Sequence, residues 1–431
     1  MKSQDVYTRQ QRIAQLAGQA ERFRMVSLNA NIDQEWMREA YRRTRKDGAP
    51  GVDGVSAQEY GRELDANLAD LLDRAKSGRY QAPPVRRTYI PKGDGERRPL
   101  GIPTLEDKIL QRAVVMVLEP IYEQDFLDCS HGFRPKRSAH TALEVLWKSI
   151  MDMGGCWLID ADIAKFFDTL NKPMLRTILD QRVGDGVIRR LVSKWLHAGV
   201  MEDWAVTFPE AGTPQGGVIS PLLSNVYLHE VLDVWFEQVI KPRLSGRAFL
   251  IRYADDFVMG FERQRDAERV LEVLPKRFEK YGLSIHPEKT RLIGFFPPER
   301  QEGERSSFDF VGFTHYWGVS RNGRNCVCRK TRRSRLTRAL GSVNTYLRET
   351  LTEPVEVQWK GLCQRMRGHY QFYGITGNFK SLSRYRYEVG RRWWRSLNRR
   401  SGHDAKAWNW FNAIILKRYP LPAERIVHSY A

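Results

Sequence analysis

Two segments of the sequence place acidic side chains within runs that otherwise favour buried strands. In IRYADDFVMGF, residues 251–261, Asp255 and Asp256 stand between two β-prone runs, which predicts a hairpin with the pair at or beside its turn. In CWLIDADIAKFF, Asp160 and Asp162 fall on one side of a strand by its two-residue period. Because an apolar strand loses stability by carrying charge, two such strands favour a functional cluster of acids over ordinary turn residues.

Carboxylates gathered from two neighbouring strands repel each other unless cations lie between them. Oxygen donors of this kind suit Mg²⁺, which completes its coordination with water and phosphate oxygens. Two such ions about 4 Å apart can hold both the attacking and the leaving oxygen of a phosphoryl displacement. The acids therefore indicate nucleotidyl transfer with two Mg²⁺ ions, for which Mn²⁺ is an alternative.

Two further segments have the composition of a triphosphate-binding site. The sequence IPKGDGERRPLGIP offers Lys92, Arg97 and Arg98 beside a predicted hairpin turn. The sequence GTPQGGVISPLLSNVYL supplies glycines that let backbone approach a ligand, then a helix, and it contains Gln215. The alternatives are ordinary surface charges near a turn and a plain polar residue in a loop.

Positive charge is concentrated at the C-terminal end. The chain carries a net charge of +19, and from Arg321 onward there are 24 Lys and Arg against 6 Asp and Glu. Aromatic residues are interleaved there, as in HYQFYG and RYRYEVGRRWWRSLNRR. Cationic groups neutralise phosphates, and flat aromatic and guanidinium faces stack on unpaired bases. We expect structured RNA as the partner of this part; the alternative is solvated helix faces around a small core.

The remaining patterns predict a mixed chain. The first 80 residues are expected to be helical around a loop at 46–56, and residues 85–103 read as a hairpin. Helices are expected over LEDKILQRAVVMVLEPIYE, after a cap at Ser138, and after Asn171. No window approaches the ~20 apolar residues of a membrane span and no secretory signal is visible, so we expect the cytoplasm and no membrane partner. The five scattered cysteines form neither a disulfide framework nor a paired zinc motif.

In order and spacing, these segments resemble the bacterial group II intron reverse transcriptases/maturases. The likeness rests on RPLGIPTLEDKILQRAV, SHGFRPKRSAHTAL, DADIAKFFD, GTPQGGVISPLLSNVYLHEVLD, RYADDFVMGF, GLSIHPEKTRLIGF and FDFVGF, and it continues into RGHYQFYGITGNF. It implies an α+β fold, with right-hand polymerase palm and fingers built on an antiparallel sheet with helices. It also implies an N-terminal helical extension and start of the fingers at 1–84, fingers and palm at 85–318, and a basic, mostly helical thumb/maturase domain at 319–431.

The resemblance implies roles for individual residues. Asp162, Asp255 and Asp256 would be the catalytic metal ligands, with Asp160 as a supporting charge. The nucleotide would be bound by Lys92, Arg98, Phe167 beneath the deoxyribose, and Gln215. The primer and template would be held by Lys289 and by Gly312 of the FDFVGF hairpin. The intron RNA would be bound by Arg332, Arg333, Arg335, Arg338, Arg391, Arg392, Arg399 and Arg400. Asp168 is expected to cap the following helix.

The implied function is RNA-directed DNA synthesis together with splicing assistance and retrotransposition by target-primed reverse transcription. The implied partners are group II intron RNA, a DNA target and primer, and dNTPs. Two alternatives stay open, namely an RNA-binding maturase with incidental polymerase activity and a domesticated relative in DNA repair or phage defence. Many relatives end in an HNH endonuclease with paired cysteines, which this sequence lacks, so insertion is expected to need opened or already nicked DNA. The oligomeric state is left open.

Overall fold

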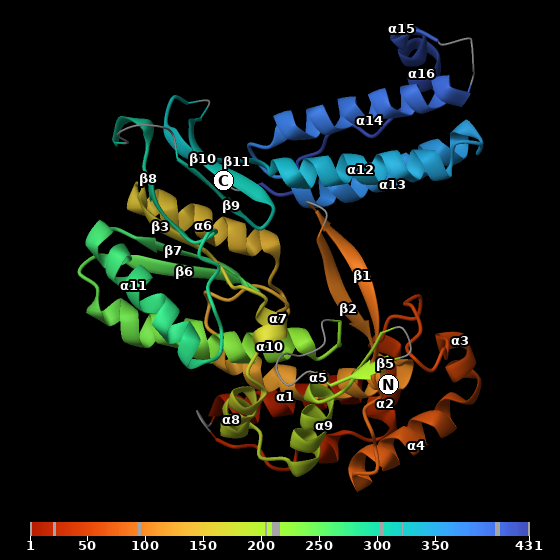
Figure 1. The fold of residues 1–431 in the computed structure, drawn as a ribbon, viewed down its shortest axis with the longest axis vertical. Coiled ribbons are helices and arrows are strands. Elements are labelled where there is room, and N and C mark those ends of the chain that lie inside the picture. Colours follow the sequence, from red (N-terminus) through yellow and green to blue (C-terminus); the bar gives the residue numbers. More distant parts are fainter. Residues whose placement is uncertain are drawn as a thin grey trace. The chain divides into compact units, whose positions relative to one another are not determined.

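The computed structural model describes residues 2–19, 23–93, 96–202, 205–208, 216–300, 306–320, 322–400 and 406–429 (Figure 1). The chain divides into two compact units. The first comprises Met1–Ala142 and Trp157–Leu292, and the second comprises Leu143–Cys156 and Ile293–Ala431. The predicted boundaries at 84/85 and 318/319 separate functional regions, whereas this division separates compact units. The functional boundaries therefore stay a prediction.

The N-terminal part of the first unit is helical, as predicted. Its helices are α1 (Lys2–Gln19), α2 (Gln34–Arg43), α3 (Ala57–Tyr60) and α4 (Leu64–Ser77), with 3₁₀ turns at Leu28–Asn31 and Gly61–Glu63. The predicted loop at 46–56 separates α2 from α3. Asp33 caps α2 by accepting from the backbone N–H of Trp36, and the indole of the fully buried Trp36 donates to the carbonyl of Ala113 at 2.9 Å.

The predicted hairpin at 85–103 is confirmed. Strand β1 (Val85–Gly93) pairs antiparallel with β2 (Glu96–Ile102). Two short strands that the sequence did not predict, β4 (Val200–Glu202) and β5 (Ala205–Thr207), extend this sheet in the order β2-β1-β4-β5, with β4 parallel to β1.

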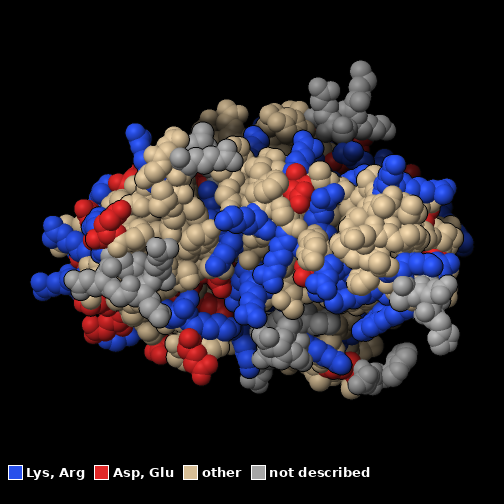
Figure 2. All heavy atoms as spheres, turned by 90° about the horizontal axis from the view of Figure 1, so that it is seen from above, with Lys and Arg blue, Asp and Glu red and all other residues tan. Residues whose placement is uncertain are grey.

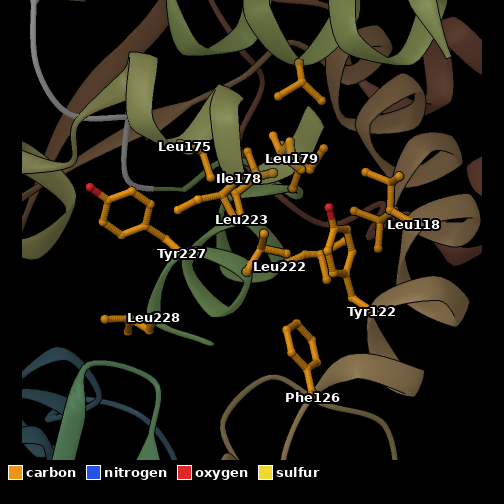
Figure 3. Close-up of a cluster of buried hydrophobic side chains, with 14 of the residues drawn as sticks. Leu118, Tyr122, Phe126, Leu175, Ile178, Leu179, Leu222, Leu223, Tyr227 and Leu228 are labelled. Carbon is orange, nitrogen blue, oxygen red and sulfur yellow. The ribbon is translucent and has the colours of Figure 1, made fainter. Parts of the chain in front are cut away.

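The core of the first unit is formed by helices from distant parts of the chain. It joins α5 (Leu105–Asp125), α8 (Lys172–Arg182) and α10 (Ser220–Leu228), which contribute Leu118, Leu179 and Tyr227 to one buried cluster (Figure 3). The remaining helices of this part are α7 (Phe166–Thr169) and α9 (Gly186–Leu196), and α10 continues as π-type turns through His229–Asp233 and Trp235–Ile240 to a 3₁₀ turn at Lys241–Arg243.

The predicted caps are partly confirmed. Ser138 accepts from the backbone N–H of Thr141 before α6 (Ala139–Met153). Asn171 caps α8 through a 2.9 Å bond from the N–H of Met174. The prediction for Asp168 is wrong, because this residue lies inside α7 and Asn171 occupies the capping position of the next helix.

An antiparallel sheet carries the acidic segments. Its order is β6-β7-β3-β8, formed by β6 (Ala248–Tyr253), β7 (Asp256–Phe261), β3 (Cys156–Asp162) and β8 (Arg291–Phe295). Helix α11 (Gln264–Lys280) packs on β7, where Phe278 stacks on Phe257 with ring centres 6.0 Å apart. This sheet and its helices confirm the predicted α+β class.

The second unit joins a small sheet to three long helices that lie side by side (Figure 1). The sheet has the order β11-β10-β9, from β9 (Ser307–Phe310), β10 (Phe313–Val319) and β11 (Asn325–Thr331). The helices are α12 (Arg333–Glu349), α13 (Val355–Tyr373) and α14 (Phe379–Arg400), followed by α15 (Trp408–Trp410), a π-turn at Phe411–Ile415 and α16 (Leu416–Arg418). A 3₁₀ turn spans Pro298–Arg300. The core of the helices includes Leu340, Leu362 and Trp393.

The described ranges contain no helix that combines the length and the apolar character needed to cross a bilayer. All five cysteines are free thiols, as expected from their spacing. Cys326 and Cys328 lie on β11 with their sulfur atoms 3.8 Å apart.

Candidate active site

The predicted acidic hairpin is formed by β6 and β7. Tyr253 pairs with Asp256 across the hairpin, so the turn consists of Ala254 and Asp255. Ala254 has a positive φ of 58°, a conformation that residues with a Cβ adopt reluctantly. On the other side of β7, Asp256 is paired with Asp162 at the end of β3. Because directly opposed residues bring their Cβ atoms within about 5.5 Å, the register places these two carboxylates next to each other.

Asp255 is half-buried, and its surroundings on balance disfavour its negative charge. Burial raises the pKa of its carboxyl above the ordinary value, and the charge of Asp162 raises it further. A backbone hydrogen bond and the charges of Arg98 and Arg252 act in the opposite direction. The charges of Asp162 and of Arg98, which lies on the β1–β2 hairpin, therefore both act on the Asp255 carboxyl.

Two basic side chains from the segment after α11 pair with the acids of β3. The ammonium of Lys289 lies 2.9 Å from Oδ2 of Asp162, and the guanidinium of Arg291 lies 3.0 Å from Oδ2 of Asp160. The segment is held against β3 by backbone bonds, including one of 2.8 Å from the N–H of His286 to the carbonyl of Asp162. Lys289, predicted to contact the primer, thus stands at the acids themselves.

The region that holds this constellation matches a known family. The sequence model of the reverse transcriptase (RNA-dependent DNA polymerase) family covers residues 90–315, slightly more than half of the chain. The chain belongs to this family. Reverse transcriptases use divalent metal ions, which agrees with the predicted chemistry of the three acids.

Individual relatives narrow the family. Protein YkfC of Escherichia coli (strain K12) is 43% identical over 221 residues, which is 50% of this chain and 57% of YkfC. The group II intron-encoded protein LtrA of Lactococcus lactis subsp. cremoris is 43% identical over 169 residues, which is 39% of this chain and 28% of LtrA. The mitochondrial nuclear intron maturase 2 of Arabidopsis thaliana is 32% identical over 176 residues, 32% of this chain and 24% of that protein. The matched segments thus span less than two thirds of each relative. They confirm the resemblance to group II intron reverse transcriptases/maturases.

The acids fit a divalent ion by chemistry but do not form a closed metal site. No three His, Cys, Asp or Glu side chains in the described part of the chain converge closely enough to hold an ion. Asp162 is instead paired with Lys289. All three predicted ligands nevertheless offer oxygen, the donor that Mg²⁺ prefers, and a cation would relieve the repulsion that Asp162 exerts on Asp255.

The structure describes two of the four predicted nucleotide-binding side chains, those of Arg98 and Phe167. Arg98 is exposed on β2 and its charge acts on Asp255. Phe167 lies in α7, half-buried, with its ring 5.2 Å from that of the buried Phe166. The side chain of Lys92 and the whole of Gln215 lie outside the described part of the chain.

One glycine of the glycine-rich segment, Gly216, lies against protein backbone. Next to Gln215, Gly216 has a φ of 115°, and a Cβ at this position would stand 2.4 Å from the carbonyl oxygen of Gly101 in β2. Only glycine therefore fits at position 216, which lies against β2 of the hairpin that carries Arg98.

In the second unit, the predicted RNA-binding arginines differ in how their charges are engaged. Gly312 forms the β9–β10 turn, and Arg332 pairs with Asp309 of that hairpin at 3.0 Å. The charges of two others are engaged locally, Arg392 by Glu388 and Arg400 by the carbonyl of Glu353. Arg391 is half-buried, whereas the remaining members have exposed side chains; these are Arg333, Arg335, Arg338 and Arg399. Basic side chains are more numerous than acidic ones in the view of Figure 2.

Sequence reasoning missed two arginines near the acids. Arg291 pairs with Asp160, and Arg252 of β6 is completely buried behind the turn. A signal for Arg252 was present, because a cation within the apolar run AFLIRY is as unusual as the acids that follow it.

Proposed function

We propose that the chain is an RNA-directed DNA polymerase that also binds a group II intron RNA and assists its splicing and retrotransposition. The observation that carries the proposal is the pairing of Asp162 with Asp256 beside the turn residue Asp255, within the range that matches the reverse transcriptase family. Because the curated relatives are covered over less than two thirds of their length, activity, substrates and partners are part of this proposal.

The residues present divide the work of nucleotidyl transfer among them. Asp162, Asp255 and Asp256 would hold two Mg²⁺ ions, which when bound supply positive charge at the attacking and leaving oxygens. Lys289 pairs with Asp162 and offsets part of its negative charge. Arg98, whose charge acts on Asp255, is proposed to pair with the triphosphate together with Lys92 and Gln215. Phe167 is proposed to exclude a ribonucleotide by its volume beneath the sugar.

The basic second unit supports the RNA-binding half of the proposal. Exposed arginines lie along α12 and at the end of α14. No aromatic-rich segment with a comparable positive charge occurs in the sequence before residue 320. We propose that residues 85–318 form the fingers and palm and that residues 319–431 form the thumb/maturase domain. A DNA primer and a DNA target are proposed as further partners. The cytoplasm stays the predicted location.

The decisive experiment is extension of a DNA primer on an RNA template with dNTPs, with and without Mg²⁺. We expect template-directed synthesis that requires the ion and is lost in Asp255→Asn. A purified chain that binds intron RNA and promotes splicing but never extends a primer would favour the maturase alternative. Intron RNA domains beside the gene would distinguish a mobile element from a domesticated enzyme.

A further inference from the structure

Arg252 is a completely buried arginine whose five N–H donors are all used. Its guanidinium forms a bidentate pair with Asp233, with Nε 2.8 Å from Oδ1 and Nη2 2.6 Å from Oδ2. Nη2 also donates to Oγ of Ser130 at 2.8 Å, and Nη1 donates to Oδ1 of Asn225 at 2.9 Å. The fifth bond, of 3.0 Å, runs from Nη1 to the carbonyl of Ala254.

These acceptors come from three parts of the first unit that are distant in the sequence. Asp233 lies in the π-type turns after α10, Asn225 lies in α10 itself, Ser130 lies in the loop before α6, and Ala254 is the turn residue next to Asp255. One side chain therefore ties the acidic turn to α10, to its π-type continuation and to the loop before α6.

The backbone around the turn is held in the same way. The N–H of Arg252 donates to the carbonyl of Cys129 at 2.8 Å, and its carbonyl accepts from the N–H of His131 at 2.9 Å. At Gly132 an added Cβ would stand 2.3 Å from the backbone nitrogen of Ala254, so the loop presses directly against the turn. The side-chain amide of Asn225 holds this loop by donating to the carbonyl of Gly132 at 2.7 Å.

A gain in stability alone does not account for this arrangement. Burying an ion pair removes two charges from water, and an apolar pair of similar volume is often at least as stable. One of the five bonds is directed at a backbone carbonyl, that of Ala254, which holds a positive φ in the turn. Such a conformation persists only when its surroundings determine it.

We propose that Arg252 is a positioning residue, which fixes the Ala254 carbonyl and so sets the direction in which the next residue, Asp255, presents its carboxylate. It does so through the Ala254 carbonyl and is proposed to contact neither substrate nor metal. The proposal rests on the proposed function, because it assigns Asp255 to the metal site. Lysine at this position would keep the charge opposite Asp233 but would offer a single nitrogen, which cannot reach all four acceptors.

The test compares Arg252→Lys with a matched control, Arg182→Lys. Arg182 is also buried, makes a bidentate pair with Asp125 and donates to the carbonyls of Ala17 and Phe23, on elements that carry none of the three acids. Four quantities are measured on the full chain. They are the thermal midpoint, the affinity for Mn²⁺ from the electron paramagnetic resonance of the free ion, and kcat and KM for primer extension per folded molecule.

We expect both variants to lose thermal stability. Only Arg252→Lys should weaken Mn²⁺ binding and lower kcat, each by about tenfold or more, with KM for the dNTP changed by less than about threefold. Equal Mn²⁺ affinity and equal kcat in the two variants would overturn the inference and leave Arg252 a stabilising residue.

If Arg252→Lys does not fold, a milder variant, Ser130→Ala, tests the same inference. Ser130→Ala keeps the guanidinium and removes one acceptor, and it should weaken Mn²⁺ binding in the same direction by a smaller factor; unchanged affinity there would also overturn the inference. A wild-type chain that binds Mn²⁺ but extends no primer would refute the proposed function. The comparison of Mn²⁺ affinities would then still decide the role of Arg252.

Discussion

The ammonium of Lys289 lies 2.9 Å from Oδ2 of Asp162, where a metal ion is proposed to bind. An internal cation and an external one therefore compete for the same carboxylate. Both partners are about half exposed, so their attraction is worth no more than about 1 kcal/mol. We predict that Lys289→Met tightens Mn²⁺ binding by about two- to fivefold. Titration of the ion against both proteins tests this, and weaker binding in the variant would mean that Lys289 helps to hold the site together.

Asp255→Asn should abolish nearly all DNA synthesis while leaving the fold intact. The change removes a charged oxygen donor where negative charge develops, and we expect a loss of about a hundredfold or more in kcat. Thermal stability should not fall, because burial and Asp162 both disfavour the charge of Asp255 in the absence of metal. Asp73→Asn, at an exposed acid paired with Arg79, serves as the control. Wild-type extension rates in Asp255→Asn would remove Asp255 from the metal site.

Phe167→Ala should admit ribonucleotides, since the proposed role of the ring is to exclude a 2′-hydroxyl. The measurement is the ratio of ribo- to deoxynucleotide incorporation on one template. Phe166→Leu is the matched control, because Phe166 is fully packed beside Phe167 and should affect stability without affecting the ratio. If the ratio is the same in Phe167→Ala as in the wild type, the ring serves only packing.

Neutralising exposed arginines of α12 should weaken binding to structured RNA. The triple change of Arg333, Arg335 and Arg338 to Gln should reduce the slope of log affinity against log salt by roughly 0.7–0.9 for each RNA phosphate that the variant no longer neutralises. A pair of changes at Arg392 and Arg400 should have a smaller effect, because Glu388 and the carbonyl of Glu353 already engage these groups. Equal salt slopes in both variants and the wild type would place the RNA-binding surface elsewhere.

Acid should destabilise the second unit through His315. This ring is completely buried, and burial, with the charge of Arg329, lowers its pKa to about 3. The unfolded chain, with a histidine pKa of about 6.5, binds the proton more readily, so stability is complete above that pH and falls as the pH drops toward 3. On going from pH 6.5 to pH 5, protonation of this histidine in the unfolded chain should lower the free energy of unfolding by about 2 kcal/mol.

The check on this prediction is urea unfolding of the wild type and of His315→Leu at both pH values. The variant should lose about 2 kcal/mol less than the wild type on going from pH 6.5 to 5. An identical loss would show that the imidazole is protonated in the folded chain, in contact with water or an acid.

Much of the local structure followed from neighbouring residues alone. The hairpin around Asp255, the β1–β2 hairpin and the caps at Ser138 and Asn171 depend on turn propensity and on side chains that bond backbone a few residues away. The acids themselves could be identified from the sequence because charge in an apolar strand is costly without a purpose. The error at Asp168 arose where two capping residues stood three positions apart and either could have served.

What joins these pieces was decided by the tertiary structure. Lys289 meets Asp162, Arg291 meets Asp160, and Arg252 meets Ser130 across more than a hundred residues of chain. Strand β4 joins β1 in the same way, although its three residues carry no strong strand signal of their own. The sequence by itself determined which residues carry charge and which segments turn, since both are local properties. Which charge lies against which acid depended on the path of the whole chain, because pairing between distant residues is set by the packing of the elements that carry them.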